Sequence, residues 1–407
     1  MNDSKFSYTE ETSFITKEIM KEITKSKNQL TIGIPKENYE EEKRLALTPE
    51  AVDMIVKAGQ RVILETEAGL GINYSDAHYL DSGATIVKDK NDVFQSDVVF
   101  KISPPTTEEI NRMKQRTTIC SMLQLPDFSK ETILAMTGKK INGIGYELIS
   151  DNNGKCYPIR TAISEIEGAA AISVASELLS NICGGKGILM GGVPGVSPTE
   201  VIIIGAGAAG TIATRAALAL GASVKIFDND VNKLRNIQSV LGKSLFTSVF
   251  QPNVLLNAFR TADVVIGAMR YIDTGSSIRY VVTEDIIKTM KKGALIIDLR
   301  INQGGCFETS CFLPQDHPSI FEKYGVLHYC VPNLSSRVAR TASMALSNIF
   351  TPFITQMGEP GGFAGMTKSD YGFRSGFYMY GGKLVNAYVA RYFNLPSNDI
   401  GLFLSAY

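Results

Sequence analysis

Short apolar runs alternate with amphipathic stretches along most of the chain, and this pattern predicts an α/β fold. In the N-terminal part, β-branched and other apolar residues predict strands at 30–35, 62–65, 97–102, 117–123 and 141–147. Thr48 and Pro49 are the residues expected at the N-cap and first position of a helix. Strands separated by helices at these intervals predict a parallel sheet with helices on both faces.

An amphipathic helix is predicted ahead of the first strand, over residues 6–26. Ile15, Ile19 and Ile23 fall on one face, with Lys and Glu elsewhere. That apolar face must pack either on its own subunit or on a neighbouring subunit, and the sequence favours neither.

The most informative stretch runs from 201 to 228. It predicts a strand at Val201–Ile204, a helix at Thr211–Leu220 and a second strand at Val224–Phe227 that ends on Asp228. Between the first strand and the helix stands a G-x-G-x-x-G sequence, Gly205-Ala206-Gly207-Ala208-Ala209-Gly210. In this order the glycines permit a tight turn and a close approach to a pyrophosphate, which the helix N-terminus attracts.

Asp228 stands where an acid accepts hydrogen bonds from an adenosine ribose, and its charge would repel a 2′-phosphate. The stretch therefore predicts binding of NAD in preference to NADP. The alternative interpretation is a glycine turn in an ordinary βαβ unit that binds no ligand.

Length and composition narrow the class of protein. A chain of 407 residues favours two domains. A net charge of zero and an isoelectric point near 6.8 argue against a nucleic-acid or membrane-surface role, and no apolar run approaches a membrane span. The polar N-terminus is no signal peptide. Six scattered cysteines without C-x-x-C predict reduced thiols and a cytoplasmic location, and three histidines without ligand spacing predict no metal site.

Two basic residues of the first domain lie just past or near the ends of predicted strands, where ligands bind in open α/β sheets. Arg44 and Lys101 suit an anionic substrate. Taken alone, each is more commonly a solvated surface charge.

Several motifs in a fixed order give the chain a family resemblance. They include IGIPKE, RLALTP, SDVVFK, SEIEG, GGVPGVSPTEVIIIGAG, QGGCFETS and HYCVPN. Over roughly residues 30–350 the chain resembles alanine dehydrogenase, in the family that also contains the NAD-binding subunit of nicotinamide nucleotide transhydrogenase. The matches at Lys101 and QGGCFETS favour the alanine dehydrogenase branch.

The resemblance implies two Rossmann-like domains with parallel sheets, the NAD-binding domain being inserted into the substrate domain. The expected boundaries are 1–29 for an N-terminal helical extension, 30–158 and 340–407 for the substrate domain, and 159–339 for the NAD-binding domain. A long helix, 341–357, would return the chain to the first domain. The resemblance also implies a homohexamer and reversible oxidation of L-alanine by NAD to pyruvate and ammonia.

Site residues follow from the same resemblance. Arg44 matches the arginine that binds the substrate carboxylate, and Lys101 matches the substrate lysine. Ser164, Val331 and Asn333 match residues around the nicotinamide.

Four further features of the matched region concern the cofactor loop, a histidine and two cysteines. A variable loop from Asp273 onward would pass near the adenosine ribose. We interpret His328 as a packed structural histidine, and Cys306 and Cys330 as small buried residues without a placed base.

The sequence departs from the family at the positions that carry proton transfer. Gln124 stands in place of the catalytic histidine and Asn302 in place of an aspartate. Both side chains keep hydrogen-bonding capacity and cannot titrate, which leaves Lys101, with Glu147 nearby, as the expected proton-transfer group. Arg300 adds a charge where the family usually has a small residue, which suggests a changed substrate or a partial replacement of lost polar contacts, unless it points to solvent.

Three hypotheses are therefore carried forward. The first is an NAD-dependent alanine dehydrogenase. The second is an enzyme of the same fold that acts on another 2-amino or 2-keto acid. The third is an NAD-binding protein with little turnover that acts in sensing or assembly.

Overall fold

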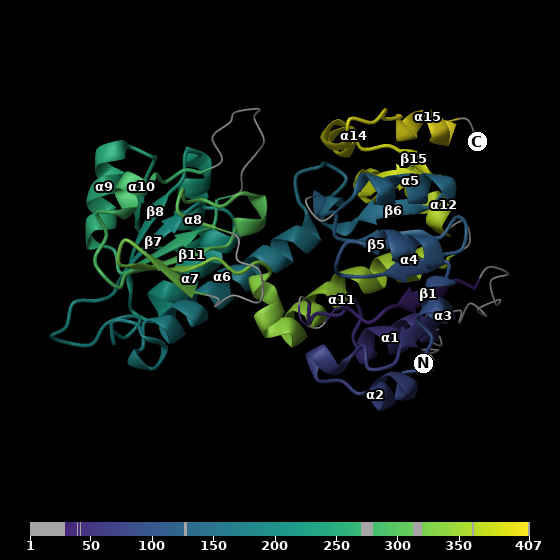
Figure 1. Ribbon diagram of the computed structural model, residues 1–407, viewed down its shortest axis with the longest axis horizontal. Coiled ribbons are helices and arrows are strands. Elements are labelled where there is room, and N and C mark those ends of the chain that lie inside the picture. Colours follow the sequence, from purple (N-terminus) through teal and green to yellow (C-terminus); the bar gives the residue numbers. More distant parts are fainter. Residues whose placement is uncertain are drawn as a thin grey trace, which may run out of the picture.

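The computed structural model describes residues 29–38, 40, 42–125, 128–269, 280–311, 320–359 and 362–405. It forms two lobes, each built around its own sheet (Figure 1). The predicted N-terminal helix at 6–26 and the loop from Asp273 to 279 lie outside the described residues.

The first lobe holds an eight-stranded mixed sheet of order β15-β14-β6-β5-β4-β1-β2-β3. The six strands of the N-terminal part pair in parallel, and the two C-terminal strands pair antiparallel at one edge. The strands are β1 (Thr31–Ile34), β2 (Arg61–Glu65), β3 (Thr85–Val87), β4 (Val98–Phe100), β5 (Thr118–Ser121), β6 (Asn142–Gly145), β14 (Phe377–Tyr380) and β15 (Lys383–Leu384).

The helices around this sheet come from the N-terminal part and from the C-terminal part of the chain. In α1, Thr48 is the N-cap and Pro49 opens the helix, where a missing N–H costs nothing. The helices are α1 (Pro49–Lys57), α2 (Asp76–Asp81), α3 (Lys90–Phe94), α4 (Thr107–Arg112), α5 (Lys130–Gly138), α11 (Ala339–Met357), α12 (Gly362–Ser369), α13 (Tyr371–Ser375), α14 (Ala387–Phe393) and α15 (Ile400–Ser405). Leu346, Phe350 and Ile354 of α11 pack into the same core as Ile32 and Ile34 of β1, so the C-terminal part completes the first lobe.

The second lobe holds a seven-stranded sheet of order β12-β13-β11-β10-β7-β8-β9, in which only the β12 pairing is antiparallel. Its strands are rich in Val and Ile because a parallel sheet is buried on both faces. They are β7 (Glu200–Ile204), β8 (Ser223–Phe227), β9 (Phe246–Ser248), β10 (Val264–Gly267), β11 (Leu295–Asp298), β12 (Ile320–Lys323) and β13 (Val326–Tyr329). The helices α7 (Ala208–Ala219), α8 (Val231–Leu241), α9 (Pro252–Thr261) and α10 (Glu284–Ile287) cover it.

Two long helices, α6 and α11, pack together and run between the lobes (Figure 1). α6 spans Pro158–Leu178 and packs on α7 as well. The approach of α6 to α7 is close at Gly168, where a Cβ atom would lie 2.2 Å from the carbonyl oxygen of Ala209. Glycine is therefore required at this position of α6.

In each sheet, the order in which the chain adds strands changes side at two neighbouring parallel strands. In the first lobe this switch point lies between β1 and β4, and in the second between β7 and β10. In open α/β sheets, ligands bind outside the carboxyl ends of the strands at such points. The segments after these four strands are therefore where a site is expected.

The predicted α/β class, with two Rossmann-like sheets, is confirmed, and each strand predicted from the sequence is present within two residues of its expected ends. The sheets are mixed, however, since the pairings β12–β13, β14–β6 and β14–β15 are antiparallel, and the strands β12, β14 and β15 were not predicted. The domain boundaries at 158/159 and 339/340 remain a prediction.

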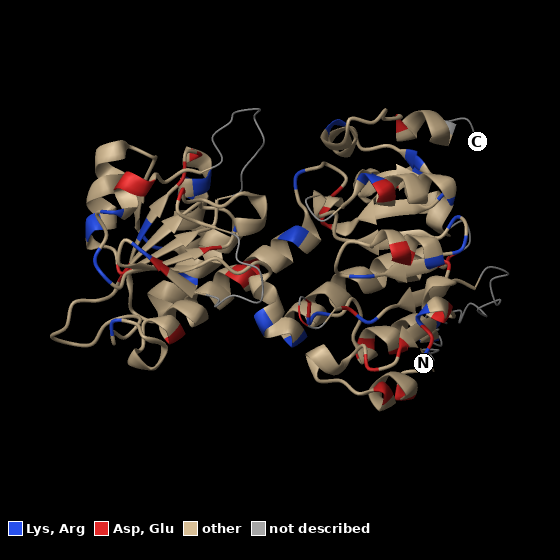
Figure 2. Ribbon diagram, viewed as in Figure 1, with Lys and Arg blue, Asp and Glu red and all other residues tan. Residues whose placement is uncertain are grey.

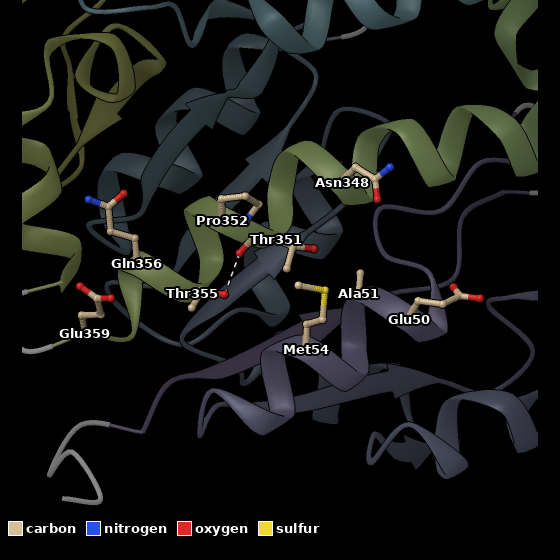
Figure 3. Close-up of a pocket in the computed structure, with 9 residues that line it drawn as sticks. All are labelled: Glu50, Ala51, Met54, Asn348, Thr351, Pro352, Thr355, Gln356 and Glu359. Carbon is tan, nitrogen blue, oxygen red and sulfur yellow. Dashed lines mark hydrogen bonds between the residues drawn. The ribbon is translucent and has the colours of Figure 1, made fainter. Parts of the chain in front are cut away.

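Basic and acidic residues are interspersed over both lobes, in line with the net charge of zero (Figure 2). A hollow of about 550 Å³ lies between α1 and α11, lined by Met54, Thr351 and Pro352 among others (Figure 3). None of the predicted site residues lines it.

Within the described residues, no helix is long and apolar enough to cross a membrane.

Candidate active site

The glycine-rich turn follows β7 directly and is tied to Asp228 at the end of β8. Gly205 has φ +107°, and a Cβ atom there would lie 2.7 Å from the backbone nitrogen of Met269. The Asp228 carboxylate accepts hydrogen bonds from the backbone N–H of Ala206, at 2.9 Å, and of Asp230, at 2.8 Å. The turn and the acid therefore form one unit.

The N-terminus of α7 is open. Gly207 is its N-cap, no side chain caps it, and a Cβ atom built at Gly207 meets nothing within 4 Å in the described structure. At Gly210, by contrast, a Cβ atom would lie 1.8 Å from the carbonyl oxygen of Gly205. Free backbone N–H groups at a helix N-terminus with open space before them suit a phosphate.

Arg44 lies after β1 and is buried, with its side chain 2% exposed. Glu42 receives two of its hydrogen bonds, from Nε at 2.7 Å and from Nη2 at 2.6 Å, and Ser335 receives one from Nη1 at 2.9 Å. The guanidinium is thus neutralised by a carboxylate of its own loop. The donors left over are the remaining N–H of Nη1 and that of Nη2, which faces the sulfur of Met122 at 4.0 Å.

Lys101 lies at the end of β4, on the other side of the same switch point. Its ammonium donates to both carboxylate oxygens of Glu109, at 3.0 and 2.9 Å, and lies 4.0 Å from Glu37. Glu109 belongs to the capping box of α4, together with Thr106. The structure therefore commits the Lys101 ammonium to two carboxylates of its own lobe.

Gln124 follows β5 and is half-buried. It stands two residues after Met122, which contacts Arg44, and next to Leu123, whose N–H donates to Glu147 at 2.8 Å. Gln124 and Glu147 are thus placed near the carboxylate-binding candidate.

The loop after β11 is organised around the buried carboxylate of Asp298. It accepts hydrogen bonds from the N–H groups of Arg300, at 2.9 Å, and Cys306, at 2.7 Å, and from the hydroxyl of Ser310, at 2.6 Å. Burial raises the pKa of Asp298, and these hydrogen bonds oppose that rise. Asn302 lies in this loop, and its buried side-chain oxygen has no hydrogen-bond partner among the described residues.

Arg300 points back toward α6 and is not solvated, since its side chain is only 14% exposed. Nη2 lies 3.5 Å from the hydroxyl of Ser164 and Nη1 lies 3.6 Å from the carboxylate of Glu167. Its Nε is buried without a hydrogen-bond partner in the part of the chain that the structure describes. Arg300 therefore contacts Ser164 and Glu167 of α6, and its Nε–H has no acceptor among the described residues.

The segment after β13 connects the cofactor side to Arg44. Val331 packs on the core of the second lobe, and Asn333, at φ +54°, opens the short helix η6 (Leu334–Val338). Within η6, Ser335 accepts the hydrogen bond from Arg44. Val331 and Asn333, the predicted nicotinamide residues, therefore stand four and two positions before Ser335, the residue that contacts Arg44.

His328 is structural, as predicted. It is fully buried, and its ring nitrogens contact the hydroxyl of Thr309, at 2.7 Å, and the carbonyl of Val326, at 3.0 Å. Burial lowers the pKa of His328 to about 4. Cys306 and Cys330 are buried as well, and burial raises the pKa of both thiols, that of Cys330 to about 12.

Sequence reasoning missed the acids of the site. Glu42, Glu109 and Glu37 hold the two predicted cations, and Glu167 faces Arg300. The available signal was weak: Glu42 is the last of three consecutive glutamates, and Glu167 lies in the SEIEG motif.

Two family models together match most of the chain. Residues 33–167 match the family described as "Alanine dehydrogenase/PNT, N-terminal domain", and residues 171–387 match the corresponding C-terminal domain. The chain belongs to the alanine dehydrogenase/PNT family. The resemblance predicted from the sequence is therefore confirmed.

Individual relatives cover nearly the whole chain. The chain is 36% identical to an alanine dehydrogenase of Staphylococcus saprophyticus over 91% of its length and 99% of that protein, and 36% identical to one of Bacillus subtilis over 82% and 86%. A solved L-alanine dehydrogenase superposes with a TM-score of 0.82 at 30% identity, covering 90% of this chain and 99% of that one. A transhydrogenase from Sinorhizobium meliloti, with a TM-score of 0.73 at 22% identity, shows the same fold.

Proposed function

We propose that this protein is an NAD-dependent alanine dehydrogenase, which converts L-alanine, NAD⁺ and water to pyruvate, ammonia and NADH in a reversible reaction. One observation carries the proposal. A single chain places an open glycine-rich turn with a tethered acid after β7 and β8, and a buried arginine after β1 that is bonded to Ser335 from the other lobe. The relatives named alanine dehydrogenase match 90–91% of the chain, which supports the proposal.

The residues of the second lobe fit NAD. The open α7 N-terminus would hold the pyrophosphate, close to Gly207, Ala208 and Ala209. Each Asp228 oxygen accepts one backbone hydrogen bond and keeps a lone pair for a ribose hydroxyl. Ser164, Val331 and Asn333 would lie around the nicotinamide. When bound, NAD supplies the acceptor for the hydride that leaves Cα.

The residues of the first lobe would hold the amino acid. Arg44 would bind the substrate carboxylate through its remaining Nη1 and Nη2 donors, since Glu42 occupies Nε and one side of Nη2. Gln124 and Asn302 would orient the reacting groups by hydrogen bonds. Lys101 would act through the Glu109 pair, by holding the β4–α4 connection in place.

A second candidate substrate is favoured by a specific observation. Arg300 and Asn302 bring a guanidinium and an amide, both with unused hydrogen-bonding atoms, to the loop after β11. A 2-amino or 2-keto acid with a polar side chain could use them. The third hypothesis, a protein of low turnover that acts in sensing or assembly, rests on the absence of a titratable group at positions 124 and 302.

One experiment separates these functions. NADH oxidation is followed with ammonia and a panel of 2-keto acids that includes pyruvate, 2-oxobutyrate, oxaloacetate and 2-oxoglutarate. Alanine dehydrogenase predicts the highest kcat/KM with pyruvate. A higher value with a polar keto acid favours the second candidate. If no keto acid is reduced while NADH still binds, the enzymatic assignment is wrong and the sensing or assembly hypothesis holds.

We also propose the homohexamer and the cytoplasmic location that the resemblance implies. The six cysteines are free thiols in the structure, which suits a reducing compartment. The mass of the purified protein by light scattering tests the hexamer.

A further inference from the structure

Glu167 is a largely buried acid that faces Arg300 and lies within electrostatic reach of Arg44. It lies on α6, two turns from the helix start, and its side chain is 12% exposed. Arg300 lies 3.6 Å away, which is too long for a firm hydrogen bond, and no hydrogen bond reaches the Glu167 carboxylate from any other described residue. Its oxygens are therefore available to a water molecule or a substrate.

The charges around Glu167 come from both lobes. Burial raises its pKa, while the positive charges of Arg300 and Arg44 oppose the rise. The same Glu167 charge acts on Arg44, the candidate carboxylate-binding residue.

The other charged groups on elements packed against α6 are paired elsewhere or exposed, among them Arg340 of α11, which lies over the Tyr74 ring, and Asp298 of β11, which accepts hydrogen bonds from its own loop. Arg337 of η6 pairs with Glu177 near the far end of α6, and Glu147 of the short helix η3 (Tyr146–Leu148) accepts the N–H of Leu123. On α7, Arg215 is exposed. Arg300 and Arg44 are thus the cations that govern Glu167.

We propose that Glu167 is the proton-transfer residue of this enzyme, in place of the carboxylate and imidazole that positions 302 and 124 no longer supply. The proposal rests on the proposed amino-acid dehydrogenase function. Lys101 is committed to Glu109 and Glu37, whereas Glu167 faces Arg300, next to Ser164 on the nicotinamide side, and is within electrostatic reach of Arg44. A substrate carboxylate bound to Arg44 would bring the amino acid into the part of the site that the Glu167 charge reaches.

The proton steps balance around this carboxylate. The α-ammonium first loses one proton to solvent, and the substrate becomes an iminium once its Cα has given up the hydride that bound NAD⁺ would accept. Water attacks the iminium carbon and gives one of its protons to the Glu167 carboxylate. The substrate thereby becomes a carbinolamine. The Glu167 carboxyl returns this proton to the nitrogen, the C–N bond breaks, and the departing ammonia takes the hydroxyl proton as the ketone forms. The sum is pyruvate, NADH, ammonium and the one proton released to solvent.

The test compares Glu167→Gln with Glu165→Gln, a change of the same type at an exposed position two residues earlier on α6. Glu167→Gln should lower kcat by about 10²–10⁴-fold, the usual contribution of general acid–base catalysis, with NADH affinity and melting temperature nearly unchanged. Glu165→Gln should behave as the wild type. Glu167→Asp should recover part of the lost kcat.

A second variant tests the role through its electrostatics. Because Arg300 holds the pKa of Glu167 down, Arg300→Gln should move the acidic limb of the kcat/KM profile for alanine oxidation to higher pH. A group that only supports the structure would not move this limb.

Three results would overturn the proposal. Glu167→Gln with normal kcat would do so, and so would a Glu167→Gln variant that raises KM alone, because that makes Glu167 a binding group. In both cases an active wild type leaves the proposed function standing. A folded, NADH-binding wild type that reduces no keto acid overturns the proposed function and this inference together.

Discussion

The guanidinium of Arg44 is already held by a carboxylate before any substrate arrives. Glu42 takes the Nε edge, and both side chains are 2% exposed. A buried pair of this kind orients its members and becomes costly when only one is removed. Substrate binding and local stability are therefore linked at this residue.

Removing Arg44 should abolish binding of the amino or keto acid and also destabilise the protein. Arg44→Ala leaves the Glu42 charge buried and unpaired, at a cost of about 3–5 kcal/mol. Arg44→Met combined with Glu42→Gln should restore most of the stability and none of the substrate affinity. Urea unfolding and substrate KM measure the two effects, with NADH affinity as the control. Normal substrate affinity in either variant would show that Arg44 does not bind the carboxylate.

Asp228 should decide between the two nicotinamide cofactors. NADH should bind the wild type much more tightly than NADPH, and Asp228→Ala should narrow this gap by weakening NADH binding by about 1.5–3 kcal/mol. Asp230→Asn is the control, since it removes a neighbouring charge and keeps a good N-cap on α8. Fluorescence titration with both cofactors measures the gap. Equal affinities in the wild type contradict the assignment.

Glu37 should make stability depend on pH. Burial raises the pKa of Glu37 from 4.5 to about 7, against the opposing charge of Lys101. The native state thus holds this proton more tightly than the unfolded state, so the stabilisation is complete below pH 4.5 and is lost as the pH rises through about 7. The difference amounts to about 3 kcal/mol.

Urea unfolding of the wild type and of Glu37→Gln, at about pH 4.5 and about pH 8, measures this loss. The wild type should lose about 3 kcal/mol relative to the variant over that interval. Parallel pH dependences of the two proteins would mean that Glu37 is ionised throughout.

Single residues were the hardest features to predict from the sequence. The positions of Gly205, Asp228 and Arg44 follow from local motifs. The partners of Arg44 and Lys101 do not, because Ser335 is 291 positions from Arg44 and a side-chain pair leaves no periodic trace. The role of Lys101 in proton transfer stays a prediction, but the sequence did not indicate that the fold brings Glu109 and Glu37 to its ammonium.

At the scale of elements, the ion pair of Lys101 with Glu109 fixes the connection from β4 to α4. Glu109 also accepts the N–H of Thr106, so the same carboxylate closes the helix N-terminus and holds the cation. The pair therefore sets the direction in which the chain leaves the switch point.

Breaking this pair should destabilise the first lobe. Lys101→Met leaves two buried carboxylates without their cation, and we expect a loss of about 3–5 kcal/mol. Adding Glu109→Gln, which keeps an acceptor for Thr106, should restore part of that stability. Denaturant unfolding follows the effect. If turnover stays lost in a double variant of normal stability, Lys101 acts on the substrate itself.

Elements were predicted well wherever the pattern was local. Buried parallel strands such as β7 are continuous apolar runs, and α1 carries its own start signal in Thr48 and Pro49. α6 was not predicted, since it is Ala-rich and partly buried around much of its surface between the lobes. The strands β14 and β15 were not predicted, because two short strands depend on their partners for their conformation.

At the scale of the whole molecule, residue 29 enters the fold beside the end of α1. The Gln29 amide donates to Gly59, and Leu30 donates to Gln60, which packs against Gly358 at the end of α11. The described part of the chain therefore begins beside the ends of α1 and α11, the two helices that line the hollow where Met54 is exposed (Figure 3).

Deleting residues 1–28 should lower the stability of the proposed hexamer if Ile15, Ile19 and Ile23 bury their apolar face against a neighbour. Light scattering and a melting curve on the truncated protein measure this. Replacing the three isoleucines by serine in the full chain is the matched variant, because it keeps the length. An unchanged mass and melting temperature would make the segment dispensable for assembly.

The pairing of β6 with β14 has a consequence for the order of events on the ribosome. β6 ends at Gly145, but the strand that covers its edge begins only at Phe377, after every strand of the second sheet has been made. The nascent chain therefore carries an open strand edge throughout synthesis of the second lobe, and such edges invite pairing with other chains. We expect the inserted lobe to close first, and the lobe that begins the chain to be the last to finish folding.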